Sequence, residues 1–364
     1  MKLKMTALAL LAGSMITPVF GQTQPVTLVL TGSTAFRPVD EDRIANLFDA
    51  GYGSTILSGN NYGVWQGTVK GAVPSITNEV IVYVSFSGSA TGMQAVEYQT
   101  PVPCVTNGGT NTTLSLPPNM AFSDVFPGAA SPPIDAGTAF ASTTTLGVIP
   151  FAWVRSNNPL LDGITNLTRD QALLLEVAGG AMPASYLGGT VTNSTNVVYF
   201  TGRTTGSGTR ITTEKDIGFT GTANLWQNLG GSKGWQLFQG FSSSSGVDGE
   251  VATNVNVISY LGLPDVENVL LPTNGCVVLS YNGVPYSTTN VENGSYAIWG
   301  YEHACIANGL SSAQQAICSA LINPITDPNY QNTNVVFTGN YFIPLGSMQV
   351  QRGADGGVIS GINF

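Results

Sequence analysis

A short segment rich in glycine, serine and threonine, Arg203–Arg210, constrains this chain more than any other stretch of its sequence. It follows an apolar run typical of a strand, Val197–Phe200, and leads into a segment that can form a helix. The first backbone N–H groups of a helix have no intrahelical acceptor, and the helix dipole places partial positive charge there. A strand, a turn of small residues and a helix start can therefore bind an anion. Arg203 can donate a forked pair of hydrogen bonds to an oxyanion, and Ser207 and Thr209 add hydroxyl donors.

The same arrangement occurs twice more, earlier in the chain. Each unit joins an apolar β-type run, a turn of small polar residues and a helical pattern: Val26–Leu30, Thr31–Phe36 and Arg37–Ala50 in one, and Val80–Val84, Ser85–Gly92 and Met93–Tyr98 in the other. Alternating strands and helices predict α/β domains with largely parallel sheets, in which ligands bind at the carboxyl ends of strands. Three such turns predict one oxyanion pocket. In the alternative interpretation, their serine and threonine side chains only cap helices.

Further elements are predicted along the rest of the chain. They are strands at Leu146–Val154, Val257–Leu261 and Tyr296–Tyr301, and helices at Thr168–Val177, Trp235–Phe241 and Ser311–Ile322. The segment Thr100–Pro118 is rich in Asn, Gly, Thr and Pro, and we expect it to be an exposed insertion. Because 364 residues exceed the usual size of a single core, we expect two domains.

The N-terminus has the pattern of a secretory signal peptide, expected at residues 1–21. Lys2 and Lys4 form a basic start, Thr6–Ile16 is a short apolar core, and Val19–Gly21 provides a small residue at the cleavage point. No cysteine directly follows the apolar core, so we expect no lipid anchor there. The sequence thus predicts a periplasmic or extracellular protein.

Charge and composition exclude several classes of function. The net charge is −9 and only 9% of residues are charged, so non-specific binding to nucleic acid or anionic membranes is not expected. An enzyme is not expected either, because the single histidine has no evident serine or aspartate partners and no paired carboxylates stand out. Ser207 also lacks the Gly-x-Ser-x-Gly context of a nucleophile elbow. We expect no cofactor and no metal, and we expect His303 to be structural or exposed.

Four cysteines in an exported chain predict disulfide bonds, and four cysteines allow three connectivities. Their spacing fits no zinc site. Among the pairings, Cys305 with Cys318 is preferred, because only a short loop and half a helix separate them.

In order and kind, these motifs resemble those of the phosphate-binding proteins of bacterial ABC uptake systems (PstS-like). Gly32–Phe36 resembles the family's first loop, Gly88–Gly92 its second, and Ala121–Pro127 its Ala-Ser-Asp-Ala-Pro segment. The most specific family motif, Arg-x-x-Gly-Ser-Gly-Thr, is intact at Arg203–Thr209, while Gly246–Gly249 is a weaker match. Thr205 stands where family members commonly carry an acidic residue that can orient the arginine.

The resemblance implies a set of ligand-binding residues. Thr34, the backbone N–H of Ala35, and Ser89 are implied to contact one face of the phosphate, and Arg203, Ser207, Gly208 and Thr209 to close the other face. Asp124 is implied to select the ligand. A desolvated carboxylate accepts a hydrogen bond from the proton of HPO₄²⁻ but repels fully ionised sulfate.

The resemblance also implies a two-lobed type II periplasmic-binding-protein fold with mixed sheets and a hinge. We expect residues 22–148 and 293–364 to form the first lobe and 149–292 the second. Inorganic phosphate is the implied ligand and an ABC permease the implied partner. Two alternatives remain: a surface or extracellular structural protein that reuses the fold and self-assembles, which the scarcity of charge favours, and a binder of another oxyanion or a phosphorylated metabolite.

Overall fold

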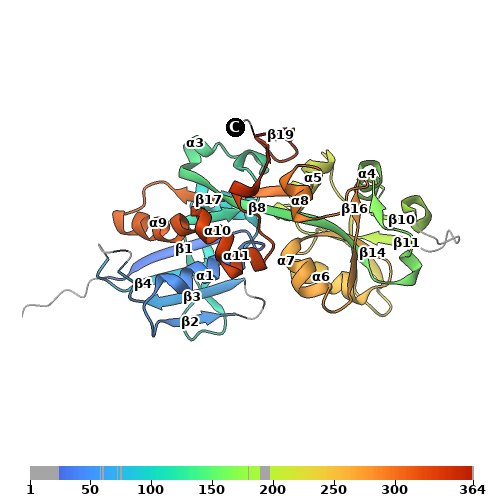
Figure 1. Cartoon of the computed structure of the whole chain (residues 1–364). Helices are drawn as coiled ribbons and strands as arrows, with labels where there is room; N and C mark the ends of the chain where they lie inside the picture. The colour runs from blue at the N-terminus through green and yellow to red at the C-terminus, as the bar shows by residue number, and fades with distance from the viewer. Residues whose placement is uncertain are drawn as a thin grey trace, which may run out of the picture.

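The computed structural model describes residues 24–57, 59, 61–71, 73, 76–178, 180–188 and 197–362 (Figure 1). The predicted signal peptide lies outside these residues. Within the described part of the chain, no helix has the length and apolar character needed to cross a membrane.

A mixed sheet runs through the whole molecule. Its strands, in spatial order, are β10 (Ala181–Pro183), β11 (Val197–Phe200), β14 (Val257–Gly262), β8 (Phe140–Ser156), β17 (Trp299–Ala307), β7 (Met120–Ser123), β1 (Val26–Gly32), β4 (Val80–Ser85), β3 (Tyr62–Gly67) and β2 (Gly53–Ile56), with β15 (Cys276–Val278) also paired to β8. Strand β1 is parallel to β4 and β7, and β11 is parallel to β14, whereas the other pairs are antiparallel. The sheet is therefore mixed rather than largely parallel.

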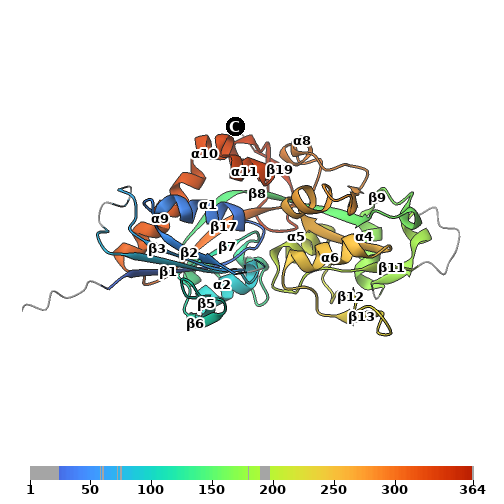
Figure 2. The same cartoon turned by 90° about the horizontal axis from the view of Figure 1, so that it is seen from below.

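The 17-residue strand β8 connects two groups of elements (Figures 1 and 2). Its first part, Phe140–Pro150, pairs with β17, and Phe151–Ser156 pairs with β14 and β15. One side of Figure 1 holds α1 (Arg37–Leu47), α9 (Ser312–Thr326) and β1–β4, and the other holds α4 (Arg169–Val177), α6 (Ser244–Thr253), β11 and β14. Both groups of elements thus hydrogen-bond to one strand.

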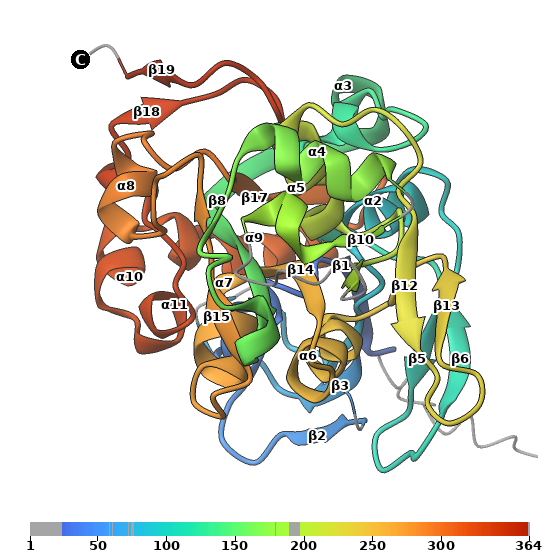
Figure 3. The same cartoon turned by 90° about the vertical axis from the view of Figure 1, so that its right-hand side faces the viewer.

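Two small hairpins and several short elements complete the fold. Figures 2 and 3 show the hairpins β5 (Val102–Val105)–β6 (Thr112–Leu116) and β12 (Leu225–Asn228)–β13 (Trp235–Phe238) on the same side of the molecule. The remaining α-helices and strands are α2 (Ser89–Glu97), α3 (Ala136–Ala139), α5 (Gly208–Ile217), α7 (Leu263–Asp265), α8 (Thr288–Glu292), α10 (Pro328–Thr333), α11 (Val335–Gly339), and the strand pairs β9 (Asn166–Leu167)–β16 (Ser280–Tyr281) and β18 (Val350–Gln351)–β19 (Ser360–Gly361).

Both faces of the sheet are covered by apolar side chains. Alternate residues of a strand point to opposite faces, so neighbouring residues of one strand lie in different apolar clusters. In β1, Leu28 and Leu30 pack in the same apolar cluster as residues of α1 and α9, whereas Val29 packs in a different one with Ala95 of α2. The largest cluster continues through Phe151 and Trp153 of β8 and includes residues from both groups of elements. One apolar cluster therefore extends from β10 to β3.

The predicted disulfides are wrong. All four cysteines are free and buried, and each lies in a different apolar cluster: Cys318 with α1 and β1, Cys305 with α2, Cys276 with α6, and Cys104 of β5 with Val29 of β1. Cys305 and Cys318 are kept apart by strand alternation, since Ala304 shares the cluster of Cys318 while Cys305 faces the α2 side. Burial raises the pKa of each thiol to about 12.

Three other expectations need correction. Trp235–Phe238 is a strand rather than a helix, because it pairs with β12 and the Trp235 ring stacks on Tyr199 at 4.1 Å. The Thr100–Pro118 segment forms the β5–β6 hairpin and buries Cys104 and Val105 against the sheet, so it is only partly exposed. The last long strand begins at Trp299 rather than at Tyr296.

Candidate functional site

The predicted site residues lie at the carboxyl ends of strands and at the N-termini of two helices. Thr34 and Ala35 lie in the turn between β1 and α1, and Asp124 directly follows β7. Ser89 is the first residue of α2. Strands β4, β1 and β7 are parallel neighbours, so their carboxyl ends share one edge of the sheet. Arg203 follows β11 on the other side of β8, Ser207 is the N-cap of α5, and Gly208 and Thr209 open that helix.

Asp124 joins the N-termini of α2 and α5. Ser89 Oγ donates a hydrogen bond to Asp124 Oδ1, and the Asp124 backbone N–H donates to Ser89 Oγ at 3.3 Å. Gly208 lies so close to the carboxylate that a methyl group on its Cα would overlap with Asp124 Oδ1. One buried carboxylate is therefore placed against the positive ends of two helix dipoles.

The second and third turns also meet through their backbones. The Ala90 N–H donates to the Gly206 carbonyl at 3.2 Å, which links α2 directly to the Arg203–Arg210 segment. Gly88 has φ +99°, a backbone conformation that glycine adopts without strain, and a side chain on it would strike the Gly206 carbonyl. The glycines of these motifs thus permit backbone contact between elements far apart in the sequence.

Burial controls the charge of Asp124. Its side chain is 2% exposed, and this burial raises its pKa to about 6. The Ser89 hydrogen bond and the Arg203 charge oppose the rise, because both favour the ionised form. At neutral pH the group is mostly a carboxylate, and it can accept a proton when the pH falls slightly.

Arg203 is almost completely buried at 2% exposure. Its Nε donates to the Phe241 carbonyl at 3.2 Å, and its Nη2 donates to the Ser242 carbonyl at 3.0 Å and to Thr34 Oγ1 at 3.4 Å. The hydrogen bond to Thr34 thereby connects Arg203 to the turn between β1 and α1. Burial lowers the pKa of the guanidinium, and Asp265, Asp124 and Asp248 oppose this by stabilising its positive charge.

Two acidic residues near Arg203 were not among the predicted site residues. Asp248 lies in α6 and Asp265 ends α7, and both stabilise the Arg203 charge. They are acidic groups beside the arginine, whereas Thr205 carries no charge. The signal for Asp248 was its place in the Gly246–Gly249 match, whereas nothing in the sequence connected Asp265 to the arginine.

The two acids differ in their hydrogen bonding. Asp265 Oδ1 accepts a hydrogen bond from Ser244 Oγ at 3.1 Å, while Asp248 Oδ1 is buried and has no hydrogen-bond partner among the residues that the structure describes. Burial and the neighbouring Asp265 raise the pKa of Asp248 to about 8. Burial also raises the pKa of Asp265, against the Arg203 charge. At neutral pH, Asp248 is therefore mainly the neutral acid.

Not every predicted residue joins this network. The side chains of Ser207 and Thr209 are buried but make no hydrogen bond within the described part of the chain, and Ser207 does not cap α5 with its hydroxyl. Ala35 is buried and approaches Gly262 across the two groups of elements. The structure thus joins Ser89, Asp124 and Gly208 directly, and Thr34 to Arg203.

His303 is a buried residue of β17. It is 3% exposed, its ring lies 4.8 Å from that of Phe126, and its Nδ1 lies 3.3 Å from Thr145 Oγ1. Burial lowers its pKa to about 4, so the ring is neutral at physiological pH. Among the described residues, no group of three or more His, Cys, Asp or Glu side chains is arranged to hold a metal ion.

A cavity of about 570 Å³ lies beside the contact between α2 and the Arg203–Arg210 segment. Its walls come from α2, α5 and the segments around residues 128–133 and 219–222, and its polar lining includes Thr91, Gln94, Thr205, Arg210 and Glu214. The Ala90–Gly206 contact contributes to its wall, so the cavity is next to the Asp124 cluster.

No protein-family model matches this chain, and no curated protein matches it in sequence. Solved structures do match it over most of its length. A putative phosphate ABC transporter substrate-binding protein with bound phosphate from Clostridium perfringens has a TM-score of 0.56 and 16% identity, over 88% of this chain and 99% of that chain. A high-affinity periplasmic phosphate-binding protein (PfluDING) bound with phosphate has a TM-score of 0.52 and 12% identity, over 88% and 91%. The chain therefore has the α/β fold with mixed sheets of the type II periplasmic phosphate-binding proteins.

Proposed function

We propose that this chain is an exported, non-enzymatic binding protein that captures inorganic phosphate between two lobes. The observation that carries the proposal is the meeting of two helix N-termini, α2 and α5, at Asp124 in a fold otherwise known from phosphate-binding proteins. Thr34, Ala35 and Ser89 bind the ligand from one lobe, and Arg203, Ser207, Gly208 and Thr209 bind it from the other. The lobes are residues 22–148 with 293–364, and residues 149–292.

Asp124 provides selectivity among tetrahedral anions. One of its oxygens accepts the Ser89 hydroxyl, and the other accepts the proton of HPO₄²⁻. Sulfate carries no proton at neutral pH, so it cannot donate a hydrogen bond to the buried Asp124 carboxylate. The hydroxyl groups of Ser207 and Thr209 have no hydrogen-bond partner in the described chain, which makes them donors for the same ligand.

Burial raises the pKa of both Asp248 and Asp265, so the negative charge around Arg203 is smaller than three ionised carboxylates would give. If Asp124, Asp248 and Asp265 were all ionised, they would outweigh the single arginine. The raised pKa of Asp248 removes most of one negative charge at neutral pH. Hinge opening would admit the ligand, and an ABC permease would receive it; we propose a periplasmic or extracellular location on the evidence of the N-terminal signal pattern.

Calorimetric titration of the mature protein with phosphate and then sulfate tests this function. The protein is first freed of ligand by unfolding and refolding. We expect 1:1 phosphate binding and weak sulfate binding. Arg203→Ala should abolish phosphate binding, and Asp124→Asn should reduce the preference for phosphate over sulfate. Asp49→Asn, an exposed carboxylate exchanged in the same way, is the matched control and should leave both titrations unchanged.

No heat with either anion, from a protein with native circular dichroism, would refute the phosphate proposal. Self-association of that sample would then favour the structural alternative. Because Arg203 is buried and its removal could prevent folding, Arg203→Lys provides a second variant. It keeps the charge but loses the forked donor geometry, so it should fold and bind phosphate more weakly.

A phosphate ester is a second candidate ligand, favoured by the cavity beside Gly206. The 570 Å³ space could hold the organic group of a small ester while the phosphate lies at Asp124. Titration with glycerol 3-phosphate distinguishes the candidates. Gln94→Trp, which places a large ring in the cavity wall, should weaken ester binding and leave inorganic phosphate binding intact.

A further inference from the structure

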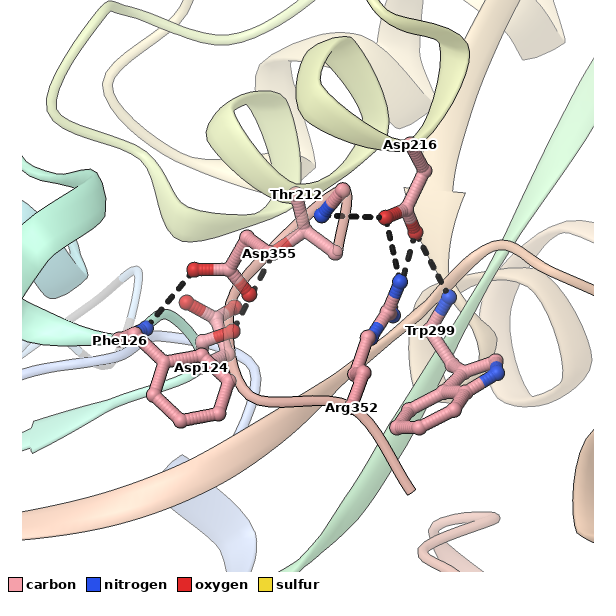
Figure 4. Close-up of polar contacts among 8 residues, drawn as sticks. Asp124, Phe126, Thr212, Asp216, Trp299, Arg352 and Asp355 are labelled. Carbon is pink, nitrogen blue, oxygen red and sulfur yellow. Dashed lines mark hydrogen bonds and ion pairs between the residues drawn. The ribbon is translucent and has the colours of Figure 1, made fainter. Parts of the chain in front are cut away.

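Residues 352–356, which we call the C-terminal strap, contact both sides of the proposed site (Figure 4). The strap lies between β18 and β19, far from the site in sequence. Arg352 and Asp355 are its two buried charged residues, at 5% and 8% exposure. No sequence motif pointed to either of them.

Arg352 fixes the carboxyl-terminal end of α5. Its Nη1 lies 2.5 Å from Asp216 Oδ1 and its Nη2 lies 3.2 Å from Asp216 Oδ2, with both side chains 1% exposed. The guanidinium also stacks on the Trp299 ring at 3.9 Å from the ring centre. Such a forked, buried pair has a defined geometry, so it holds α5 in one position relative to the strap and β17.

Backbone donors complete the Asp216 contacts. The N–H groups of Gly356 and Trp299 donate to its two oxygens at 3.0 and 3.2 Å. Gly356 has φ +69°, and a side chain there would collide with the Lys215 carbonyl. Glycine at this position thus allows the strap to lie directly against the end of α5.

Asp355 fixes the other side of the site. Its Oδ2 accepts a hydrogen bond from the Phe126 backbone N–H at 2.8 Å, two residues after Asp124. Thr212 of α5 donates from its Oγ1 to the Asp124 carbonyl at 3.2 Å. Figure 4 shows these contacts near one another, with the strap between the Asp124 segment and the end of α5.

We propose that Arg352 and Asp355 are positioning residues: they hold the Asp124 segment against α5 and so set how fast the two sides of the site separate. The rate argument rests on the proposed phosphate function, whereas the positioning itself can be measured without a ligand. Loss of either contact should favour the open arrangement. We expect the rate of phosphate release to rise on the order of tenfold to a hundredfold, with little change in the association rate.

Stopped-flow measurement of phosphate association and release in Asp355→Ala and Asp355→Asn tests the proposal. Asparagine keeps an oxygen acceptor for the Phe126 N–H, so it should restore a release rate close to that of the wild type, which a loss of general stability would not predict. Arg352→Ala should resemble Asp355→Ala. Gln351→Ala, an exposed neighbour, is the matched control. If Arg352→Ala does not fold, the two Asp355 variants decide the question.

Hydrogen exchange separates this proposal from the proposed function. In ligand-free protein, Asp355→Ala should expose the Phe126 amide and the amides of α5 to exchange, and Asp355→Asn should not. Wild-type release rates and unchanged exchange in a folded Asp355→Ala protein would overturn the positioning role. If the wild-type protein binds no phosphate, the phosphate-binding proposal is wrong. The exchange data alone then decide whether the strap positions α5 and the Asp124 segment.

Discussion

The replacement of Gly208 by alanine tests the contact on which the candidate site depends. Gly208 is the first residue of α5, and its φ is not in the left-handed region, so alanine meets no backbone strain there. The obstacle is steric, since the new methyl group would overlap with Asp124 Oδ1 and lie 2.7 Å from Ser89 Oγ. Either the carboxylate must rotate away from Ser89 or α5 must move.

The expected cost has two parts. Forcing a methyl group into a filled space costs about 1–3 kcal/mol. Breaking the hydrogen bond between Ser89 and the buried carboxylate adds about 1.5–3 kcal/mol. We therefore expect the free energy of unfolding to fall by about 3–5 kcal/mol. With a urea m-value of about 3 kcal/mol/M, the unfolding midpoint would fall by roughly 1–1.7 M.

Urea unfolding followed by tryptophan fluorescence measures this change. Gly249→Ala is the matched control, because Gly249 lies within α6 with no atom near the position of a new methyl group. There, alanine should raise the stability by about 0.5–1 kcal/mol. A Gly208→Ala protein as stable as the wild type would show that Asp124 is not held against α5, and it would refute the site geometry described above.

Three further predictions follow from burial and charge. Burial raises the pKa values of Asp124 to about 6, Asp355 to about 7 and Asp248 to about 8, so the native state binds more protons than the unfolded state above about pH 4. The free energy of unfolding should therefore fall as the pH rises through these values. His303, whose pKa is lowered, acts in the opposite direction below about pH 6.5. A calorimetric Tm that climbs steadily from about pH 5 to pH 8 would contradict this prediction. The four buried thiols should react with a thiol reagent only after unfolding, and a disulfide found by mass spectrometry would show that the described arrangement is wrong. Asp248→Asn should change the phosphate affinity at about pH 7 by no more than roughly twofold. At about pH 9, where Asp248 of the wild type is ionised, the variant should bind phosphate several-fold more tightly than the wild type. Equal affinities of the variant and the wild type at the higher pH would exclude a charge effect of this residue on the site.

Local patterns allowed much of the fold to be predicted. The units around Val26–Leu30 and Val80–Val84 were recognisable because each strand, turn and helix start is determined within a few neighbouring residues. The helix at Thr168–Val177 was recognisable for the same reason, and Thr168 forms its capping box with Gln171. The resemblance identified the mixed two-lobed α/β class, which the solved structures support at the level of the fold.

Contacts between distant segments could not be predicted in this way. Trp235–Phe238 has a pattern compatible with a helix, and its partner strand and the Tyr199 ring decide that it is a strand. The cysteine prediction assumed that the thiols lie close together, but tertiary packing places each thiol in a different apolar cluster. Asp265 approaches Arg203 only through tertiary packing.

The Asp216–Arg352 pair also bears on how the polypeptide acquires its structure during synthesis. Asp216 lies at the end of α5 and is buried with its counter-charge supplied by a residue more than a hundred positions later. A nascent chain that has not yet reached Arg352 would have to bury an unpaired carboxylate to dock α5, which is strongly unfavourable. Docking of α5 should therefore wait for the strap to be synthesised.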